Sequence, residues 1–527
     1  MSWRRSLLVA LLLFASLTYL WGVRRDLPHA PGSDEVDFIL IAAQMSASGD
    51  LNPHWFGHPG SPFIYAYAAA LHLANALEND GPWLAAYPAL PRYLERNRGT
   101  AILLGRLVSV AYGVLALWLV CLVGDRAFGR PVGLIGAWFA LLSPITLDHV
   151  DMARTDGAGL FFGFLALWAL LRLLGQPSRA AHAVAGLTLG LGVATRYFLA
   201  GLLPLLLVVD WVLLRRAGLE GTPGDLQSTA LGLACVPLGL VAGAPFLLTE
   251  IPTVIDSLAH EARATHPGAD GLGPLGNLAW YFRVALPRSV PPVLLGLAAI
   301  GAIVAVVRRE LGPLLLLAFV VVFLGGISLA SLHWGRWLIQ ILPILSLLAA
   351  AALVFLVRRL AALGRAGPRA ATLVLASCVM ALSIGPARSY VRFVQVQAAP
   401  STRERSRDWI VRRLSPTERI AADLYTAPLQ DTPFERTDYV FSWAQVVSSP
   451  VELHDRGYDI AMVSSAVYRR FLSQPGRYPR EVAFYQALFA TQELLAEFRP
   501  GAGGRGPVIR LYRLTGNTRE RAPGENP

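Results

Sequence analysis

The feature that most constrains this chain is a series of eleven long apolar runs. A helix that crosses a membrane needs about 20 consecutive, mainly apolar residues, and runs of this length are rare in water-soluble domains. The apolar residues are continuous rather than alternating with polar ones, so they predict helices and not strands. The expected spans are Leu7–Val23, Ile102–Val123, Val132–Leu147, Gly157–Leu174, Ala181–Thr195, Phe198–Leu214, Thr229–Leu248, Pro292–Val307, Leu311–Ala330, Trp337–Val357 and Ala371–Pro386.

Composition excludes the other large classes of protein. Apolar residues make up 54% of the 527 residues and charged residues only 15%, whereas soluble domains carry about 25% charged residues. The numbers argue against a disordered, collagen-like, coiled-coil or disulfide-rich chain. Cys121, Cys235 and Cys378 each lie within an apolar run, too far apart for a disulfide framework or a metal site. We expect them to be packing residues.

The net charge of +11 does not indicate nucleic-acid binding. The chain contains no lysine, so all 46 basic residues are arginines, and many lie in short clusters between apolar runs. The sequence has no zinc-finger spacing and no continuous basic stripe with interleaved aromatic residues. We therefore expect membrane lipids, and not nucleic acid, among the partners of this chain.

The arginine clusters predict which side of the membrane each loop faces. If the spans alternate, fourteen clustered arginines fall on one side, which the positive-inside rule makes cytoplasmic. The N-terminus is then cytoplasmic and the C-terminus extracytoplasmic, in the cytoplasmic (inner) membrane of a bacterium. The fourteen are Arg4, Arg5, Arg126, Arg130, Arg172, Arg179, Arg215, Arg216, Arg308, Arg309, Arg358, Arg359, Arg365 and Arg369.

Two features of this topology have alternatives. The count takes Leu7–Val23 as a retained helix, although a cleaved signal peptide also fits its position. It also takes Ala181–Leu214 as two helices that turn near Arg196, although one long tilted helix fits the same residues. A single helix there would move the arginines from Arg308 to Arg369 outside, so the charge distribution favours two helices.

Two segments are too polar for the membrane: an outer loop over residues 24–101 and a C-terminal domain over residues 388–527. The C-terminal domain mixes helix-like and strand-like stretches, which predicts a small α/β fold. We therefore expect a polytopic α-helical membrane protein with about eleven transmembrane helices. Its membrane domain covers residues 1–387, including the loop, and its outer α/β domain covers residues 388–527. The stretches are Arg403–Leu414 and Glu481–Leu495 for helices, and Arg419–Leu424, Tyr458–Val463 and Val508–Leu514 for strands.

Acidic residues gather at the outer ends of the early spans. Carboxylates near the interface are costly if they enter lipid, so their position requires water or a function. Helix capping explains Asp34 and Asp156 when each is taken alone. Two clusters on the same side of one bundle favour a functional site. The clusters are Asp34, Glu35 and Asp37 after the first span, and Asp148, Asp151 and Asp156 between the third and fourth spans.

Three arginines, Arg106, Arg196 and Arg336, fall on the outer side, against the orientation rule. Such an arginine either extends its side chain to the interface or pairs with a carboxylate. The alternative is that its planar guanidinium binds a phosphate. Outer acids beside outer arginines suggest a site where an anionic lipid headgroup meets a proton acceptor.

The first loop also contains His54 and His58, within Asn52–Phe63. Proline and glycine residues separate and flank these histidines, so they do not share a helix face, and the loop has no His-Glu-x-x-His motif. A metal site is therefore not indicated, and we expect no required cofactor, with a divalent metal as the alternative. A sugar-facing or structural role suits His58 better.

Short motifs follow one another along the chain in an order typical of one enzyme group. The chain resembles the GT-C glycosyltransferases that use polyprenyl-phosphate sugars, the group that contains protein O-mannosyltransferases and lipid A aminoarabinose transferases. The resemblance covers nearly the whole chain. The motifs are Asp34-Glu35, His58-Pro59, Gly105-Arg106-Leu107-Val108-Ser109, Phe128-Gly129-Arg130, Ser143-Pro144, Ala153-Arg154-Thr155-Asp156, Gly192-Val193-Ala194-Thr195-Arg196-Tyr197, and Arg336-Trp337 ahead of Leu342-Pro343.

The resemblance implies inverting transfer of a hexose or pentose from a polyprenyl-phosphate-linked donor to an acceptor hydroxyl on the extracytoplasmic face. The acceptor is a glycan, a lipid or a protein. Such a reaction needs a base on the acceptor side and cations on the leaving side. A phosphate leaving group is already a weak base, so no dedicated general acid is needed.

The resemblance also implies a role for each candidate residue. The residues are Asp34 as general base with Glu35 beside it, Arg106, Arg196 and Arg336 as ligands of the donor phosphate, and His58, Asp151, Arg154 and Asp156 as substrate-binding residues. The passage from His58 to Pro62 departs from the closer proline pair of the relatives. This departure puts the loop's acceptor contacts in doubt, and not the chemistry.

Two other functions compete with sugar transfer. A lipid-linked-sugar flippase or secondary transporter would show paired halves and polar or Gly/Pro-interrupted helices at mid-membrane. Here the helix middles are almost uniformly apolar and the polar residues gather at one face. A non-catalytic scaffold would explain the C-terminal domain but not the acidic clusters.

Overall fold

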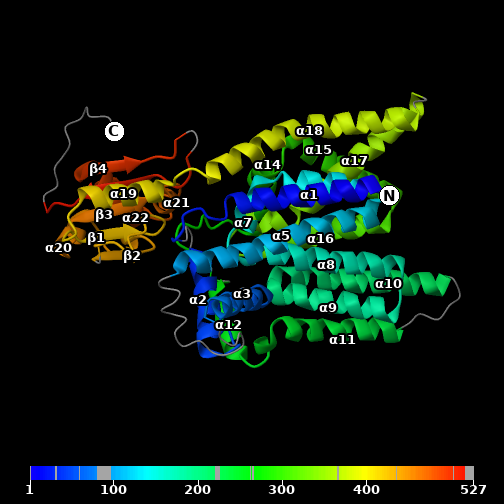
Figure 1. The fold of residues 1–527 in the computed structure, drawn as a ribbon, viewed down its shortest axis with the longest axis horizontal. Coiled ribbons are helices and arrows are strands. Elements are labelled where there is room, and N and C mark those ends of the chain that lie inside the picture. The colour runs from blue at the N-terminus through cyan, green and yellow to red at the C-terminus, as the bar shows by residue number, and fades with distance from the viewer. Residues whose placement is uncertain are drawn as a thin grey trace. The chain divides into compact units, whose positions relative to one another are not determined.

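The computed structural model divides the chain into two compact units. The helical unit comprises residues 1–24, 33–263 and 272–394, and the C-terminal unit comprises residues 25–32, 264–271 and 395–527. In the helical unit the long helices run side by side (Figure 1). The structure describes residues 2–29, 33–57, 60–79, 97–219, 226–261, 263, 266–364, 367–434, 436–501 and 504–516.

The helical unit confirms a polytopic membrane protein. Within the described ranges, eight helices are long and apolar enough to cross a membrane, and two bent helix pairs bring the number of spans to ten if each pair is one span. The eight include α1 (Ser2–Trp21), α5 (Arg98–Phe128), α8 (Thr155–Gly175), α10 (Leu203–Leu219), α11 (Leu226–Gly243), α16 (Leu311–Leu329), α17 (Leu342–Leu363) and α18 (Pro368–Gln397).

The eleventh expected span, Ala181–Thr195, corresponds to α9 (Arg179–Thr195). Its 17 residues are at the lower limit of the roughly 17–25 residues of a membrane-spanning helix. With α9 as a span, the eight long helices and the two bent pairs agree with the eleven spans expected.

Prolines explain the two bent pairs. Pro144 begins α7 (Pro144–Val150) after α6 (Val132–Leu141), and the two helices meet at 73°. Pro292 begins α15 (Pro292–Arg308), which meets the preceding helical segment Pro274–Ser289 at 119°. Proline lacks the N–H of a helix interior and disfavours helical geometry in the residue before it, so each bend falls where a new helix starts.

The chain breaks at Arg196, as the charge distribution predicts. Arg196 adopts an extended conformation between α9 and η1 (Tyr197–Leu202), and α10 follows. His182 of α9 and Asp210 of α10 approach within 3.1 Å. Because both lie fourteen residues from Arg196, α9 and α10 form an antiparallel pair and not one long helix.

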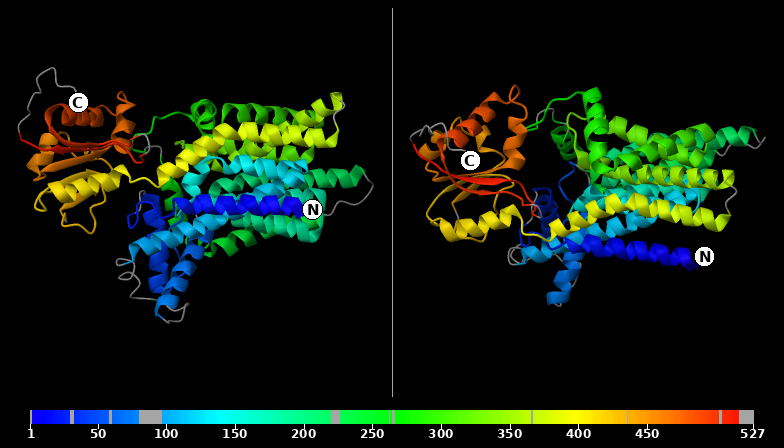
Figure 2. Two further views of the ribbon diagram at one scale, coloured as in Figure 1. Left: turned by 45° about the horizontal axis from the view of Figure 1, so that its top comes forward. Right: turned by 90° about the horizontal axis from the view of Figure 1, so that it is seen from above.

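The first helix is part of the packed core. Leu11, Ala15 and Tyr19 are buried in the main hydrophobic cluster of the helical unit. The Tyr390 hydroxyl of α18 donates a hydrogen bond to Thr18 of α1, and the right view of Figure 2 shows the two helices on the same side of the bundle.

The segment after α1 contributes two helices that do not qualify as spans. The helix α2 (Ser33–Ser48) packs on α3 (Ser61–Asn79) through an edge-to-face contact of Phe38 with Phe63, with ring centres 5.7 Å apart. Short helices connect the remaining spans. They are η2 (Pro245–Leu247), α12 (Ile251–Glu261), α13 (Pro274–Trp280), the π-helix η3 (Tyr281–Ala285), α14 (Leu286–Ser289) and η4 (Gly335–Gln340).

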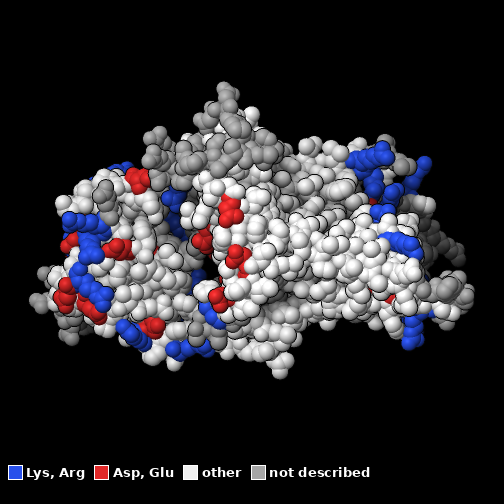
Figure 3. Space-filling view, turned by 90° about the horizontal axis from the view of Figure 1, so that it is seen from below, with Lys and Arg blue, Asp and Glu red and all other residues white. Residues whose placement is uncertain are grey.

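The surface of the helical unit fits this arrangement. Figure 3 shows a broad face without charged side chains over the helices, and basic side chains at the end of the unit where the chain begins. Arg126 of α5, Arg172 of α8 and Arg216 of α10 lie in the last turns of their helices. A one-sided distribution of arginines is what the positive-inside rule predicts for the cytoplasmic ends.

The C-terminal unit has the expected α/β fold. Its sheet has the order β2-β1-β3-β5-β4, in which β2, β1 and β3 are parallel and β5 and β4 are antiparallel to their neighbours. Three strands and α19 match the sequence predictions, whereas the second expected helix ends early and its last residues form β4. The elements are α19 (Thr402–Arg413), β1 (Ile420–Asp423), β2 (Thr437–Val440), η5 (Trp443–Gln445), α20 (Pro450–Asp455), β3 (Ile460–Ser464), α21 (Ser465–Leu472), α22 (Pro479–Thr491), β4 (Glu493–Phe498) and β5 (Ile509–Arg513).

Alternation along the strands builds two small cores in this unit. Ile420 and Ala422 of β1 pack in one cluster with Ile410 of α19. Ala421, between them, packs in the other cluster with Phe484 of α22. Successive side chains of a strand point to opposite faces, so α19 covers one face of the sheet and α22 the other (Figure 1).

The boundary between the units differs from the expected one. The last helix, α18, continues through Pro386 to Gln397, and the C-terminal unit begins at residue 395 and not at 388. Residues 25–32, which the sequence places in the outer loop, group with the C-terminal unit.

Candidate functional site

The first turn of α2 carries the first candidate carboxylate. Asp34 and Glu35 lie there, where negative charge is favourable to the helix dipole. Asp34 Oδ2 accepts hydrogen bonds from Arg154 Nη2 at 2.5 Å and from Arg336 Nη1 at 2.8 Å. One carboxylate oxygen is therefore shared between two guanidinium groups from different parts of the chain.

The ion pairs continue into the bundle. Arg154 Nε lies 3.5 Å from Asp156 Oδ2, and Arg196 Nη1 lies 2.8 Å from Asp156 Oδ1. We call Asp34, Arg154, Asp156, Arg196 and Arg336 the charged network. Three arginines against two carboxylates leave it with one excess positive charge when all five are ionised.

The side chains of the charged network range from buried at one end to partly exposed at the other. The side chain of Asp156 is 1% exposed and that of Arg196 is 8% exposed, whereas Arg336 and Asp34 are 27% and 32% exposed. Arg336 Nε has no hydrogen-bond partner among the described residues. An anionic ligand can therefore reach the Asp34–Arg336 end, while the Asp156–Arg196 end supports it from inside.

Local backbone geometry explains how the arginines reach the network. Arg154 and Arg196 both adopt extended conformations, the first just before α8 and the second just after α9. Gly159 of α8 provides room for Arg196, because a Cβ there would lie 2.8 Å from both Arg196 Cδ and Gln340 Nε2. Arg336 comes from η4, after a loop that links α16 to this short helix.

The structure places Glu35 and Arg106 apart from the network, in a buried pair of their own. Arg106 Nε donates to Glu35 Oε1 at 2.8 Å and Arg106 Nη2 donates to Glu35 Oε2 at 3.0 Å, and both side chains are fully buried. Arg106 Nη1 donates to the Val23 carbonyl and Glu35 Oε1 also accepts from the Ala153 N–H, each at 2.8 Å. The buried pair joins α2 to α5, and neither side chain has exposed surface.

Two further candidates lie outside the network. Asp151 is buried at the end of α7, within electrostatic range of Tyr19 and Tyr390, so its surroundings are α1 and α18. His58 lies outside the described residues.

Two polar residues near the network were given no individual role from the sequence. Gln340 is 2% exposed and lies against Gly159 beside Arg196; its sequence signal is a lone polar residue in the apolar run after Arg336. Asp37 lies one turn after Asp34 on α2. Partial desolvation and the negative charge of Asp34 raise the pKa of Asp37 above its ordinary value.

The described residues contain no group of three or more His, Cys, Asp or Glu side chains that could hold a metal ion. The carboxylates of the network instead face arginines. Chemically, such an arrangement can hold an oxyanion against guanidinium groups with a carboxylate beside it.

A family comparison points to sugar transfer. Residues 80–240 match the profile of the family described as dolichyl-phosphate-mannose-protein mannosyltransferase. This region contains Arg106, Arg154, Asp156 and Arg196. No protein of curated function matches the sequence.

Solved structures show the same fold. The crystal structure of ArnT from Cupriavidus metallidurans bound to undecaprenyl phosphate is 16% identical, with a TM-score of 0.51 over 95% of this chain and 97% of that chain. The archaeal oligosaccharyltransferase AglB from Archaeoglobus fulgidus, in complex with an inhibitory peptide and a dolichol-phosphate, is 12% identical, with a TM-score of 0.53 over 94% of this chain and 73% of that chain. Both are glycosyltransferases of the GT-C fold, and this chain therefore has the GT-C fold with a C-terminal α/β domain.

Proposed function

We propose that this protein is an inverting membrane glycosyltransferase that moves a sugar from a polyprenyl-phosphate donor to an acceptor hydroxyl. The observation that carries the proposal is the sharing of Asp34 between Arg154 and Arg336. It puts a potential base and two potential phosphate ligands within one hydrogen bond of each other. The undecaprenyl phosphate and dolichol-phosphate bound by structures of the same fold support a lipid phosphate as the ligand.

The excess positive charge of the network suits the donor phosphate. A phosphate group presents several oxygens that accept hydrogen bonds from guanidinium forks. Arg336 is the most exposed arginine of the network, and its buried Nε has no hydrogen-bond partner among the described residues. Arg154 is 12% exposed. It donates to the same oxygen of Asp34 as Arg336 does, and it would be the second ligand of the phosphate. Arg196 acts from deeper in the bundle by balancing the charge of Asp156.

The reaction assigned to this site is a single displacement. Asp34 accepts the proton of the acceptor hydroxyl as the acceptor oxygen attacks the anomeric carbon of the donor sugar. The bond from this carbon to the phosphate oxygen breaks, and the lipid phosphate leaves with the electron pair. Positive charge at the leaving phosphate stabilises the transition state more than the ground state, because charge on the phosphate grows as the bond breaks.

The ion pairs of Asp34 also suggest an order of binding. Both hydrogen bonds end on Asp34 Oδ2, so the two arginines occupy the oxygen that would otherwise contact the acceptor hydroxyl. A donor phosphate competes with Asp34 for Arg154 and Arg336. Donor binding would therefore release Asp34 to accept a proton, which favours binding of the donor before the acceptor.

The direct test is transfer of radiolabelled sugar by the purified full chain in detergent. The assay supplies a panel of polyprenyl-phosphate sugars with a crude acceptor fraction from the cell envelope. We expect label to move into glycan, lipid or protein, with release of polyprenyl phosphate. A flippase would move the donor across proteoliposomes without forming a product, and that outcome would overturn the proposal.

A further inference from the structure

The C-terminal unit contains a pocket of its own, between the helix α19 and the edge strand β4 of the sheet. The pocket has a volume of about 380 Å³, which falls within the range of pockets that bind small ligands. A folded protein partner would not fit into it. The lining residues are Arg405, Asp408, Trp409, Arg412 and Arg413 of α19, and Phe498 at the end of β4.

Helical spacing puts the lining residues of α19 on one face of that helix. Arg405, Trp409 and Arg412 follow one another at intervals of four and three residues, so their side chains lie along the same face. Ile410, on the neighbouring face, is buried in the core under the sheet. Arg405 and Arg412 are separated by about two turns, or roughly 10 Å along the helix axis. Positive charge is therefore offered along the length of the pocket and not at a single point.

Two aromatic rings form the apolar wall of the pocket. Trp409 and Phe498 meet edge to face, with ring centres 6.2 Å apart and ring planes at 69°. Both rings pack against the core cluster of this side of the sheet, yet both remain only partly buried. The face of an aromatic ring carries partial negative charge and an apolar surface. Such a wall suits the C–H groups of a flat ligand such as a sugar ring.

The polar wall of the pocket carries an excess of positive charge. Three arginines accompany one carboxylate, so the lining has two excess positive charges when all four groups are ionised. Arg412 Nη2 lies 3.7 Å from Asp408 Oδ2, and the two side chains are 74% and 62% exposed. An exposed ion pair contributes little to stability, so Arg412 can exchange Asp408 for an anionic ligand. Asp408 is then available to accept hydrogen bonds from ligand hydroxyls.

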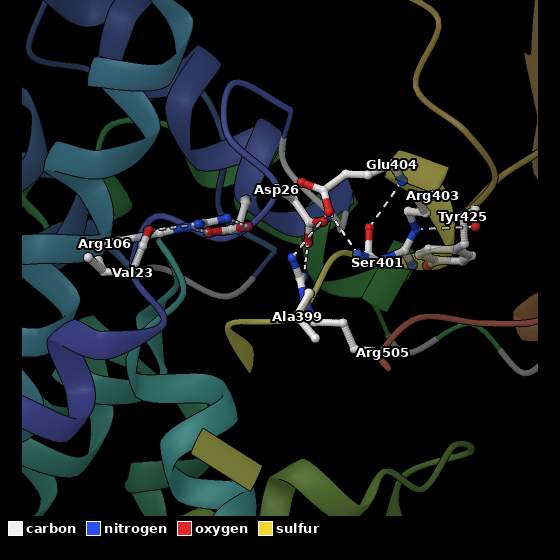
Figure 4. Close-up of polar contacts among 10 residues, drawn as sticks. Val23, Asp26, Arg106, Ala399, Ser401, Arg403, Glu404, Tyr425 and Arg505 are labelled. Carbon is white, nitrogen blue, oxygen red and sulfur yellow. Dashed lines mark hydrogen bonds and ion pairs between the residues drawn. The ribbon is translucent and has the colours of Figure 1, made fainter. Parts of the chain in front are cut away.

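Contacts at the start of α19 fix this helix within the C-terminal unit. Ser401 and Glu404 form a capping box there, and Arg403 Nε donates to the Tyr425 carbonyl at 3.2 Å. Figure 4 shows these contacts side by side. The wall that carries the arginines is therefore held in place before any ligand binds. A wall held in this way lowers the entropy that is lost on binding.

We propose that this pocket binds an acidic saccharide, a sugar chain that carries carboxylate or phosphate groups. The sugar ring packs against Trp409 and Phe498, and the acidic groups bind the arginines, whose planar forks suit oxyanions. The aromatic wall favours a saccharide over a bare anion, and the concave shape favours it over a flat membrane surface. Binding of the saccharide does not depend on sugar transfer, whereas its use as the acceptor glycan rests on the proposed function.

The test measures binding of radiolabelled digalacturonate to the full chain in nanodiscs of neutral lipid, by equilibrium dialysis. An exposed charge contact is worth roughly threefold in affinity. We therefore expect Arg412→Gln combined with Arg413→Gln to lower the affinity for digalacturonate about 10-fold. Maltose, which has no acidic group, should bind wild type much more weakly than digalacturonate does. Equal affinity for the two sugars would overturn the proposal.

Arg456→Gln combined with Arg469→Gln is the matched control. These exposed arginines belong to α21 and the end of α20. Both helices pack in the core cluster on the opposite face of the sheet from α19. The control makes the same change in net charge and should bind digalacturonate as wild type does. Equal losses of affinity in the two double variants would overturn the site, because they would report only the overall charge.

Trp409→Leu tests the aromatic wall. We expect it to lower the affinity for digalacturonate about 5-fold and to leave the affinity for inorganic phosphate within about twofold of wild type. Inorganic phosphate that binds wild type as tightly as digalacturonate does would overturn the saccharide assignment, even if Trp409→Leu fails to fold.

Two further outcomes separate this site from a membrane contact and from the proposed function. Binding of phosphatidylglycerol vesicles without binding of digalacturonate, lost in the Arg412 and Arg413 double variant, would make the pocket a membrane contact and overturn the proposal. Failure of sugar transfer in a protein that binds digalacturonate would remove the acceptor role and support a binding site that is independent of the proposed function.

Discussion

At the residue scale, the two kinds of buried arginine in this protein differ in what surrounds the guanidinium. Arg106 Nε and Nη2 donate to Glu35, Arg106 Nη1 donates to the Val23 carbonyl, and the side chain has no exposed surface. Arg336 shares Asp34 with another arginine, remains partly exposed, and keeps Nε without a partner in the described part of the chain. The sequence predicts both arginines on the outer side of the membrane, so this position does not distinguish them. They differ in whether the N–H groups of the guanidinium have hydrogen-bond partners.

Asp34→Asn tests the general base. Asparagine keeps the shape and much of the hydrogen-bonding capacity of aspartate, but it does not accept a proton at neutral pH. Loss of a general base lowers the rate about 10²- to 10⁴-fold, so turnover should collapse while donor affinity is retained. The measurement is sugar transfer and donor affinity on matched monodisperse preparations. If Asp34→Asn turns over within a few-fold of wild type, the base must be sought among the neighbouring acids, beginning with Asp37.

Arg336→Ala tests the phosphate contact. Loss of a charge-assisted hydrogen bond in a partly dry site costs about 2–3 kcal/mol, or roughly 30- to 150-fold in donor affinity. Arg336→Lys should recover only part of this loss, since an ammonium group lacks the planar fork. Arg308→Ala, which removes an exposed ion pair with Glu310, is the control and should bind donor normally. Normal donor affinity in folded Arg336→Ala would return this residue to a purely structural role.

Arg106→Gln tests the buried pair. Removal of one partner leaves the Glu35 carboxylate buried without its countercharge, which costs about 3–5 kcal/mol. We expect a lower unfolding temperature in detergent, measured by loss of the monodisperse peak after heating. The protein that remains folded should bind donor as wild type does. A specific loss of donor affinity without loss of stability would instead make Arg106 a phosphate ligand.

At the scale of elements, the C-terminal unit contains a buried carboxyl at the end of its central parallel strands. Asp423 ends β1, accepts hydrogen bonds from the Trp443 N–H at 2.9 Å and the Tyr485 hydroxyl at 2.7 Å, and is fully buried. Burial raises the pKa of Asp423 to about 7, against the lowering effect of these two hydrogen bonds. The folded unit therefore binds a proton at Asp423 more tightly than the unfolded chain does.

This pKa sets a pH dependence for the unit. Because the pKa of Asp423 is raised on folding, the free energy of unfolding falls as pH rises from about 4 to about 7, by on the order of 4 kcal/mol, and is then constant. Asp423→Asn removes this titration and should slow amide exchange of β1 and β3 about 10-fold or more at pH 8, with little effect at pH 5.

Asp438→Asn provides a contrast in the opposite direction. A hydrogen bond from Tyr458, with the Arg419 guanidinium beside it, holds the pKa of Asp438 below its ordinary value. Stability from this group is present above pH 4 and is lost as pH falls further.

Equal exchange in Asp423→Asn and wild type at pH 8 would mean that Asp423 ionises without cost to the fold.

At the scale of the whole molecule, chain direction and charge predict where the C-terminal unit lies. Alternation of the spans and the arginine distribution predict that the C-terminal unit, of which residues 395–527 are the main part, lies outside the cytoplasmic membrane. Protease added to intact spheroplasts should remove this unit and leave the helical unit in the membrane. An epitope fused at Pro527 should be lost at the same time, with a cytoplasmic marker as the control for leakage. Protection of this epitope would reverse every assignment of sidedness.

Local patterns in the sequence determined the elements of this protein. Apolar runs of membrane length correspond to the helices of the bundle, because burial in lipid depends on composition over one continuous stretch. The break at Arg196 and the strands β1, β3 and β5 also follow from local patterns. Asp34 was predicted as a site residue because it follows the first span. The strands β2 and β4 were not expected. β4 begins two residues after α22 ends, so the helix expected over Glu481–Leu495 extended into it.

Only the tertiary structure decided which charges meet. In the sequence, Asp34 and Glu35 are adjacent and equivalent, but on α2 they point to different partners, one to the charged network and the other to Arg106. Arg505 meets Asp26 across 479 positions of the chain. Such pairings depend on how helices and strands pack, and no local pattern encodes them. The physical reason is that an ionised side chain inside a protein needs a partner in space, whereas the sequence records only neighbours along the chain.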